Sequence, residues 1–292
     1  MAQQLDPATR EALLDRVRFY RDLGLTEFYR RPVDPALIAQ LSGESDQAQT
    51  LGAPSIRQPS GEWVGDHEPA SIPQTHSQED HPIPPRKPIP VPPQIAAAIP
   101  SADRAAALQL IRDEIGDCTR CPLHKGRNKL VFGDGSPNAR LMFVGEGPGA
   151  DEDAQGLPFV GKAGQLLNNM IAAMGLRRDE VYIANVVKCR PPGNRVPEQE
   201  EGATCTPFLF RQIDVIRPQI LVALGATAAT WLLGSRQPLA GLRGRIHPVR
   251  GAQLIVTYHP AYLLRDPRQK KEAWADLQIA MRELGLKPPA KN

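Results

Sequence analysis

The four cysteines of this 292-residue chain are spaced like ligands of a single inorganic site. Cys118 and Cys121 form a C-x-x-C pair, Cys189 lies 68 residues further on, and Cys205 follows after another 16. Four thiolates fit either zinc or an iron–sulfur cluster, and the spacing does not decide between the two. Disulfides are the competing interpretation, but a C-x-x-C pair with two distant partners favours metal ligation in a reducing compartment.

The other residues able to do chemistry gather in three segments. The first, GEGPGADEDAQGLPFVGKAGQLL (145–167), holds carboxylates and an aromatic ring. The second, ANVVKCRPPGNRVPEQEE (184–201), holds an amide and several cations, and the third, TYHPAYLLR (257–265), holds an imidazole. Each segment begins at or directly after a short apolar run, which places its polar residues where a strand ends.

Two glycine-rich strings in the first segment look like nucleotide-binding motifs. GEGPGA ends in Ala150, we expect helix onset to wait until about residue 163, and the next strand ends in Asn185 instead of an acid. GLPFVGKA puts Ala163 where a phosphate loop needs a hydroxyl. We therefore expect neither NAD nor ATP binding, although Lys162 could still face a DNA phosphate.

The elements that must position these segments alternate between strand and helix from residue 101 onward. We expect strands at 141–144, 181–187, 220–224 and 254–258, and helices at 105–115, 163–174, 198–216, 226–233 and 268–284. Short apolar strands separated by helices predict a three-layer α/β/α fold with a central four-stranded parallel sheet. Ligands of such sheets bind at the carboxyl ends of the strands, where the three segments begin.

The three segments resemble the signature stretches of family 4 uracil-DNA glycosylases. The resemblance covers about residues 104–285, keeps the motifs in order and includes all four cysteines. It implies a hydrolase that cleaves the N-glycosidic bond of uracil in single- or double-stranded DNA and leaves an abasic site for base excision repair. It also implies that the cysteines hold a [4Fe–4S] cluster with a structural role.

The resemblance further implies roles for individual side chains. Phe159 would stack on the uracil ring, and Asn185 would pair with its N3–H and O4. His259 would donate a hydrogen bond to uracil O2 as negative charge develops on the leaving base. Glu146 and Glu152 are carried over as catalytic carboxylates, and the split between them stays open: either could position water, stabilise the sugar cation or exclude the thymine methyl group.

Two more positions belong to the expected substrate site. Gly147 stands where family 1 relatives have an Asp, so their water-activating role is not transferred by position. Leu263 or Leu264 is expected to fill the space that the base vacates, with Arg265 on a phosphate. The competing interpretation of Leu263 is a core leucine at the start of a helix.

Charge supports a polyanionic partner. Residues 101–292 contain 26 Lys and Arg against 19 Asp and Glu, whereas residues 1–100 contain 9 against 13. A basic domain suits DNA. Lys188, Arg190 and Arg195 are expected to form a basic edge for its phosphates.

The first hundred residues form two segments outside the resemblance. Residues 1–42 are expected to be helical and could dock another repair or replication protein. Residues 43–100 are expected to form a disordered linker, because twelve prolines lie from Pro54 to Pro100. The start of the chain has no signal-peptide pattern, and no apolar run reaches about 20 residues. We therefore expect a cytoplasmic monomer with a glycosylase domain at 101–292.

Two functions compete with hydrolytic excision. A DNA-binding protein without turnover could use the same fold, although the retained Glu146, Asn185 and His259 argue against it. A covalently trapping relative of the family carries Gln in place of Gly147 and a His-containing insertion after the second strand. This chain has the glycine and the sequence RPPGNRVP there, so it lacks both features.

Overall fold

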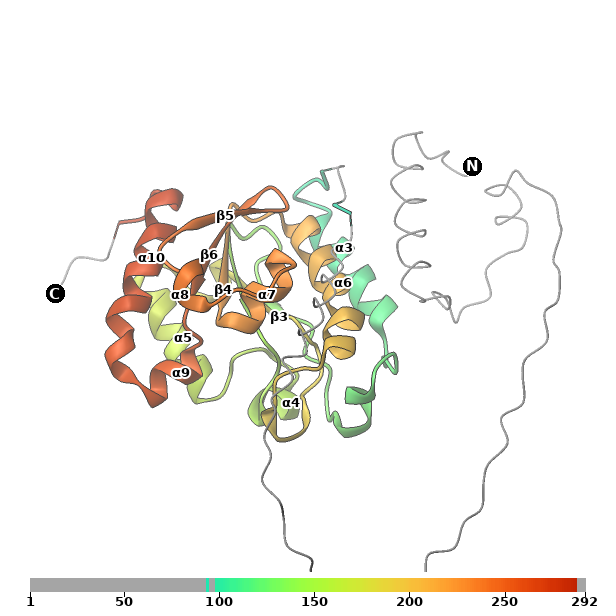
Figure 1. Cartoon of the computed structure of the whole chain (residues 1–292). Helices are drawn as coiled ribbons and strands as arrows, with labels where there is room; N and C mark the ends of the chain where they lie inside the picture. Colours follow the sequence, from blue (N-terminus) through green and yellow to red (C-terminus); the bar gives the residue numbers. More distant parts are fainter. Residues whose placement is uncertain (1–92, 95–97, 288–292) are drawn as a thin grey trace, which may run out of the picture. The chain divides into compact units, whose positions relative to one another are not determined.

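The computed structural model describes residues 93–94 and 98–287, all of which fall in one compact unit of the chain (Figure 1). The expected helical segment at 1–42 and nearly all of the expected linker at 43–100 lie outside the described residues. Those two assignments therefore stay predictions, as does the domain boundary at residue 101. Within the described part of the chain, no helix is long and apolar enough to cross a bilayer.

A six-stranded sheet forms the centre of this unit, in the order β1-β3-β2-β4-β6-β5. Its strands are β1 (Asp134–Gly135), β2 (Leu141–Gly145), β3 (Tyr182–Asn185), β4 (Ile220–Leu224), β5 (Ile246–Val249) and β6 (Ala252–Thr257). The four inner strands run parallel, and β1 and β5 pair antiparallel at the two edges.

The expected mixed α/β fold is confirmed, but the sheet has six strands where the sequence predicted four. The two strands that were missed carry no apolar run. β1 has only two residues, and β5 contains Pro248 and has its first three residues at least partly exposed. Edge strands need not bury both faces, so they lack the pattern that marks the inner four.

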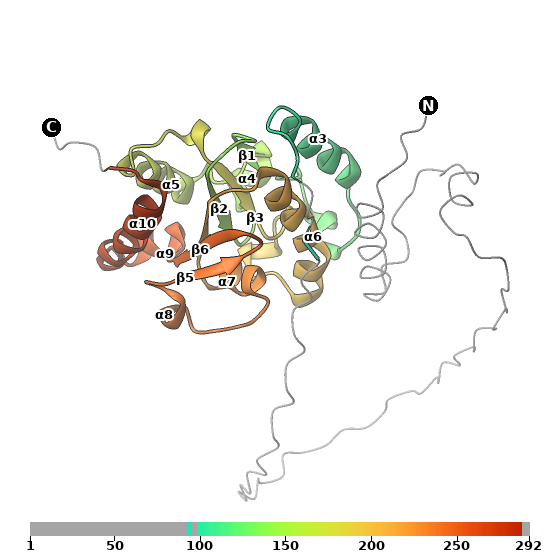
Figure 2. The same cartoon turned by 90° about the horizontal axis from the view of Figure 1, so that it is seen from above.

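Helices cover both faces of the sheet (Figures 1 and 2). They are α3 (Arg104–Ile115), α4 (Ala150–Gln155), α5 (Lys162–Ala173), α6 (Gln199–Ile216), α7 (Ala226–Leu233), α8 (Leu239–Leu242), α9 (Pro260–Arg265) and α10 (Lys270–Leu284). Met142 and Val144 of β2 share a core with α3, α6 and α7, whereas Leu141 and Phe143 share a core with α5, α9 and α10. Alternate residues of one strand thus enter opposite cores, as the pleat requires.

Helix α4 begins at Ala150, so the expectation that helix onset waits until about residue 163 was wrong. Three consecutive acids at residues 151–153 occupy its first turn, where the helix dipole favours negative charge. The helix ends at Gln155, and its C-cap Gly156 has a left-handed φ of +80°. The first segment is therefore folded around a short helix, and only residues 156–161 separate α4 from α5.

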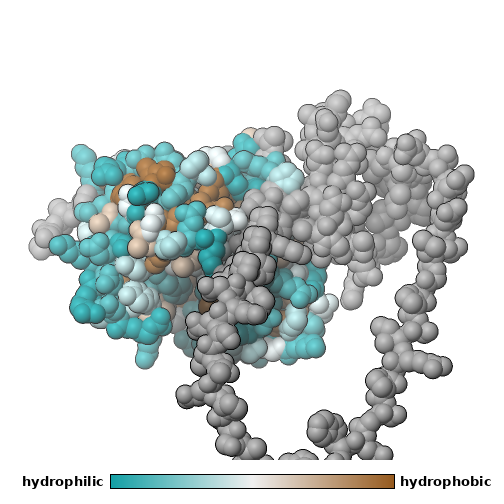
Figure 3. Space-filling model, viewed as in Figure 1, coloured by the Kyte–Doolittle hydropathy of each residue, from teal (hydrophilic) through white to brown (hydrophobic). Residues whose placement is uncertain are grey.

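The face drawn in Figure 3 is mostly hydrophilic, with a few small groups of hydrophobic residues. Among the described residues, the large apolar side chains that stay exposed are Leu110, Leu157, Val196, Ile246 and Leu264. Three of these follow the carboxyl ends of the inner strands: Leu157 after β2, Val196 after β3 and Leu264 after β6.

Candidate active site

Three of the expected site residues meet around Gly145, the last residue of β2. A Cβ atom at this glycine would collide with Asn185 Oδ1 and would lie 2.6 Å from Phe159 Cζ. The rings of Phe159 and His259 have their centroids 5.6 Å apart. The loop after β2, the end of β3 and the start of α9 thus bring an aromatic, an amide and an imidazole together, and residue 145 is glycine because a side chain would occupy their space.

Asn185 presents a buried hydrogen-bond acceptor to this cluster. It pairs with Gly145 in the parallel register of β2 and β3 and is only 1% exposed. Among the described residues, none donates a hydrogen bond to its Oδ1 atom. A buried acceptor without a donor costs about 1–3 kcal/mol, so this position is suited to a ligand that supplies an N–H group.

His259 is neutral and has a defined tautomer. The backbone N–H of Ala261 donates to Nδ1 at 3.1 Å, which leaves the proton of the neutral ring on Nε2. Burial is the main cause that lowers the pKa of His259 to about 4; the charge of Arg265 lowers it further, and Glu152 acts in the opposite direction. At neutral pH the ring therefore offers an uncharged Nε2–H donor.

Glu152 uses both carboxylate oxygens on backbone N–H groups. Its Oε1 atom accepts from Val160 at 2.9 Å and Gly161 at 3.0 Å, and its Oε2 atom accepts from Gly149 at 3.0 Å. These contacts cap α4 and tie it to the loop that follows Phe159. They give no support to the expected catalytic role of Glu152, because a carboxylate held in this way braces the loop.

The carboxylate of Glu146 has fewer hydrogen-bond partners than that of Glu152. It is half-buried, and burial raises the pKa of its carboxyl group, partly offset by a hydrogen bond with Thr227 at the start of α7. Its neighbour Gly147 packs closely on the second segment: a Cβ there would lie 2.8 Å from Val187 Cγ2. Thr227 has no signal in the sequence, since it is one of two threonines in a helix whose other residues are apolar.

Two residues that were expected on the DNA-facing surface are buried. Leu263 is 1% exposed and packs in the core beside α5 and α10, so its assignment to the substrate site was wrong. Leu264, the alternative that the sequence left open, is 44% exposed.

Lys188 is also 1% exposed, so it cannot belong to the expected basic edge. Its Nζ atom donates instead to the backbone carbonyl of Asn185 at 2.9 Å and to Gln212 Oε1 at 2.6 Å. Of the three expected phosphate contacts, Arg190 and Arg195 keep partly exposed side chains. The mostly apolar run VYIANVV (181–187) directly before Lys188 is the sequence signal that could have indicated its burial.

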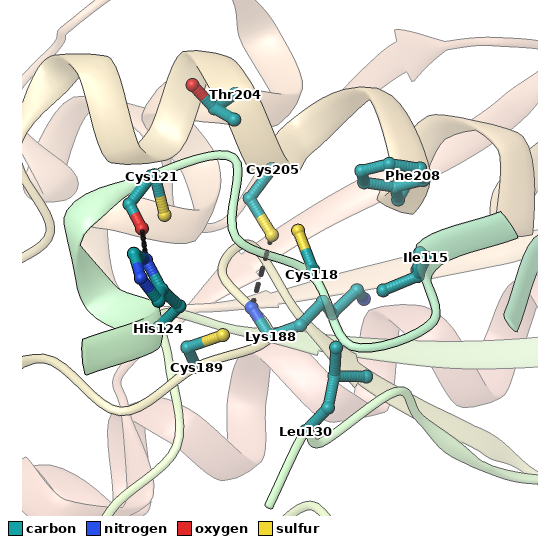
Figure 4. A pocket seen from close by; sticks show the side chains of 10 residues that line it. All are labelled: Ile115, Cys118, Cys121, His124, Leu130, Lys188, Cys189, Thr204, Cys205 and Phe208. Atoms are coloured by element: carbon teal, nitrogen blue, oxygen red, sulfur yellow. Dashed lines mark hydrogen bonds between the residues drawn. The ribbon is translucent and has the colours of Figure 1, made fainter. Parts of the chain in front are cut away.

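The four cysteines line one pocket together with apolar side chains of Ile115, Leu130 and Phe208 (Figure 4). They come from the loop after α3, the start of the turn at 122–126, the segment after β3 and helix α6. All four are free thiols, and their sulfur atoms point toward a common space in Figure 4. Within the described part of the chain, no three His, Cys, Asp or Glu side chains are close enough to hold a single metal ion.

The surroundings of these thiols suit a cationic inorganic group. Burial is the main cause that raises the pKa of Cys121 to about 11 and that of Cys205 to about 12, and neighbouring thiols contribute. Four thiolates in this space therefore need bound cations. Three donors already face the sulfurs: Arg127 to Cys189 at 3.2 Å, Arg120 to Cys118 at 3.4 Å, and the backbone N–H of residue 188 to Cys205 at 3.3 Å.

Comparison with known proteins points to one superfamily. Residues 132–278 match the profile described as the Uracil DNA glycosylase superfamily. The chain is 47% identical over 165 residues to a Type-4 uracil-DNA glycosylase of Thermotoga maritima, which covers 56% of this chain and 86% of that protein. It is 45% identical over 180 residues to a Type-4 enzyme of Pyrobaculum aerophilum (59% and 92%) and 34% identical over 146 residues to a Type-5 enzyme of the same organism (44% and 64%).

Proposed function

This chain belongs to the uracil DNA glycosylase superfamily, and we propose that it excises uracil from DNA by hydrolysing the bond between the base and deoxyribose. One observation of the site carries the proposal: the buried Oδ1 acceptor of Asn185 lies beside the Phe159 ring at Gly145, with the neutral His259 ring next to that aromatic. An N–H acceptor, a stacking face and an N–H donor are what a planar pyrimidine requires.

Asn185 is the proposed reader of the base. Its Oδ1 atom would accept from uracil N3–H, and its amide group would donate to O4. Cytosine has an unprotonated N3 and an amino group at C4, so both contacts would be mispaired. Each mispaired buried group costs about 1–3 kcal/mol, so each of the two contacts discriminates against cytosine by a factor of about five to a hundred and fifty.

His259 is the proposed donor to the leaving group. Negative charge grows on uracil O2 as the glycosidic bond breaks, and an Nε2–H group fixed in place stabilises that charge without reorganisation. The hydrogen bond from Ala261 to Nδ1 fixes both the ring and the tautomer. The base would leave as an anion while its proton donor stays in place.

Glu146 is the proposed carboxylate for the sugar side of the reaction. It is only half-buried, and its one assigned side-chain partner is a hydroxyl, so its oxygens are less committed than those of Glu152. An ionised carboxylate there would stabilise the cationic deoxyribose or orient the attacking water. Leu264 and Arg265, both exposed on α9, are the proposed contacts with the vacated stack and a phosphate.

Cys118, Cys121, Cys189 and Cys205 are the proposed ligands of a [4Fe–4S] cluster. The four free thiols that line one pocket, the raised pKa values of Cys121 and Cys205 and the N–H donors around the sulfurs fit such a group. When bound, the cluster would supply a covalent cross-link between the segment before β1, the segment after β3 and helix α6. Arg127 and Arg120 would then offset part of the negative charge of the thiolates.

A labelled oligonucleotide with a single uracil tests the proposal. After incubation and alkali treatment, excision yields a cleaved strand on a denaturing gel, covalent trapping yields a shifted intact strand, and binding alone yields neither. Asn185→Ala should lower the excision rate about a hundredfold or more, because two base contacts are lost. Asn138→Ala, at an exposed asparagine between β1 and β2, is the matched control and should excise at the wild-type rate.

A further inference from the structure

Phe159 has a backbone conformation that non-glycine residues seldom adopt. Its φ of +53° lies in the left-handed region, where the Cβ atom crowds the backbone. The ring is nevertheless 5% exposed and aimed at Gly145 and His259. Surrounding contacts must therefore hold this turn in place, since the residue itself prefers another conformation.

Arg178 supplies contacts on the carbonyl side of the turn. It opens the short turn Arg178–Glu180, directly before β3. Its Nη2 atom donates to the carbonyl of Pro158 at 2.6 Å, and its Nη1 atom donates to the carbonyl of Phe159 at 3.1 Å. A planar guanidinium can serve two successive carbonyls at once, which an ammonium group cannot match.

The other side of the same turn is held by different groups. Glu152 accepts the N–H groups of Val160 and Gly161, as described above. Helix α5 packs so closely that a Cβ at Gly164 would collide with the Phe159 carbonyl group. The loop around Phe159 is thus held at its carbonyl groups by Arg178 and at its N–H groups by Glu152, and helix α5 packs against its backbone.

Arg178 also connects the two halves of the base site. The segment that begins with Arg178 continues through β3 and ends at Asn185, which reads the base in the proposed function. One stretch of eight residues thus holds the stacking residue at its start and carries the amide at its end.

We propose that Arg178 is a positioning residue of the uracil site, which sets the place of the Phe159 ring relative to the Asn185 amide. This inference rests on the proposed function, because it presumes that Phe159 stacks on the base. The alternative is a purely structural arginine that stabilises the domain without influence on the base.

The test compares Arg178→Met and Arg178→Lys with Arg177→Met. Arg177 is the adjacent residue, its side chain is 73% exposed, and its ion-pair partners Asp179 and Glu180 lie on the surface. Arg177→Met therefore shows the effect of removing one positive charge at this place without removing the contacts with the loop. The readouts on the full-length protein are single-turnover excision, inhibition by free uracil and thermal unfolding. We expect Arg178→Met to lower excision and weaken uracil inhibition about ten- to a hundredfold, Arg178→Lys to lose less, and Arg177→Met to match wild type.

A double-mutant cycle separates positioning from general stability. If Arg178 acts only through the Phe159 ring, removing Arg178 should have no further effect once the ring is gone. Free uracil should then inhibit the double variant Phe159→Ala/Arg178→Met as strongly as it inhibits Phe159→Ala alone. Losses that multiply would overturn the proposal, as would an Arg178→Met protein that is folded and binds uracil like wild type. If that variant does not fold at the assay temperature, Arg178→Lys decides, and unchanged uracil inhibition in it overturns the proposal. Failure of the wild-type protein to excise uracil would instead reject the proposed function, before any variant is measured.

Discussion

The ammonium group of Lys188 donates a hydrogen bond of 2.9 Å to the backbone carbonyl of Asn185, and the backbone N–H of the same lysine faces Cys205 Sγ at 3.3 Å. One fully buried residue therefore contacts both the thiol pocket and the strand end that carries the base-reading amide. Its Nζ atom is further held by Gln212 Oε1 at 2.6 Å. Lys188 thus joins the two places, through its backbone N–H on one side and its side chain on the other.

Lys188→Met should weaken excision while the iron site persists. Methionine fills a similar volume but leaves the carbonyl of Asn185 and the Gln212 oxygen without their donor, and each unsatisfied buried acceptor costs about 1–3 kcal/mol. We expect the excision rate to fall by up to about tenfold, and the amount of iron per chain to stay unchanged. Lys125→Met, at an exposed lysine near the same pocket, is the control. Wild-type excision in a folded Lys188→Met protein would show that the contact does not matter for the site.

The pH dependence of stability should report on His259. Its pKa is lowered to about 4 in the folded protein, mainly by burial, against about 6.5 in the unfolded chain. The folded state binds fewer protons between these values, so the stabilising contribution is present above pH 6.5 and is lost as the pH falls toward 4. Between pH 7.5 and pH 5 the free energy of unfolding should drop by about 2 kcal/mol on account of this group.

Denaturant unfolding of wild type and His259→Asn at the two pH values isolates that contribution, because the carboxyl groups titrate in both proteins. We expect the variant to lose less stability than wild type on acidification. Protonation of His259 should not lower the excision rate of the wild-type protein between pH 5.5 and 8, because the ring stays neutral in that range. Equal pH dependence in the two proteins would mean that His259 has an ordinary pKa.

If the proposed cluster is bound, Cys205→Ser should remove it and with it much of the stability. Cys205 is half-buried on α6 and would join that helix to the other three proposed ligands, so its loss would open the cross-link. Loss of a structural metal site belongs to the few changes that cost more than about 4 kcal/mol. Iron analysis, visible absorbance and thermal unfolding measure this, with Thr204→Ser, one position earlier in the helix, as the control. A colourless, zinc-loaded and fully active wild-type protein would contradict the cluster itself.

Those parts of the fold that follow from local patterns could be predicted, and those that depend on distant partners could not. The inner strands are apolar runs, so all four were found; β3 ends at Asn185, two residues before the expected end at 187, and β6 ends at Thr257, one residue before the expected end at 258. Lys188 was misplaced because a lysine is seldom buried, and Gln212, 24 residues away, is what makes its burial possible here. Leu263 and Leu264 are adjacent, and only the start of α9 at Pro260 decides which of them faces the core.

The role of Arg178 was invisible for a similar reason. It follows another arginine in an exposed, charged stretch, and nothing local distinguishes Arg177 from Arg178. Only the folded loop, with its left-handed Phe159 and two carbonyls turned toward the guanidinium, separates them. Residues that act by holding backbone groups leave no chemical signature in the sequence.

Gly145→Ala tests the convergence of the site with a single added methyl group. The methyl would occupy space now shared by Asn185 Oδ1 and the Phe159 ring, so one or both must move. A displacement of about 1 Å can cost a hundredfold in rate, and we expect a loss of about that size in single-turnover excision with weaker inhibition by free uracil. The strand itself tolerates alanine, because the φ of this glycine is not in the left-handed region.

Gly126→Ala is the matched control, since an added Cβ there would meet no other atom within 4 Å. It should excise uracil at the wild-type rate and keep its iron. If Gly145→Ala also kept the wild-type rate and uracil inhibition, the base could not lie between Phe159 and Asn185 as proposed. The comparison is sharp because both changes add the same methyl group to a glycine and only one adds it at the point where the three site residues meet.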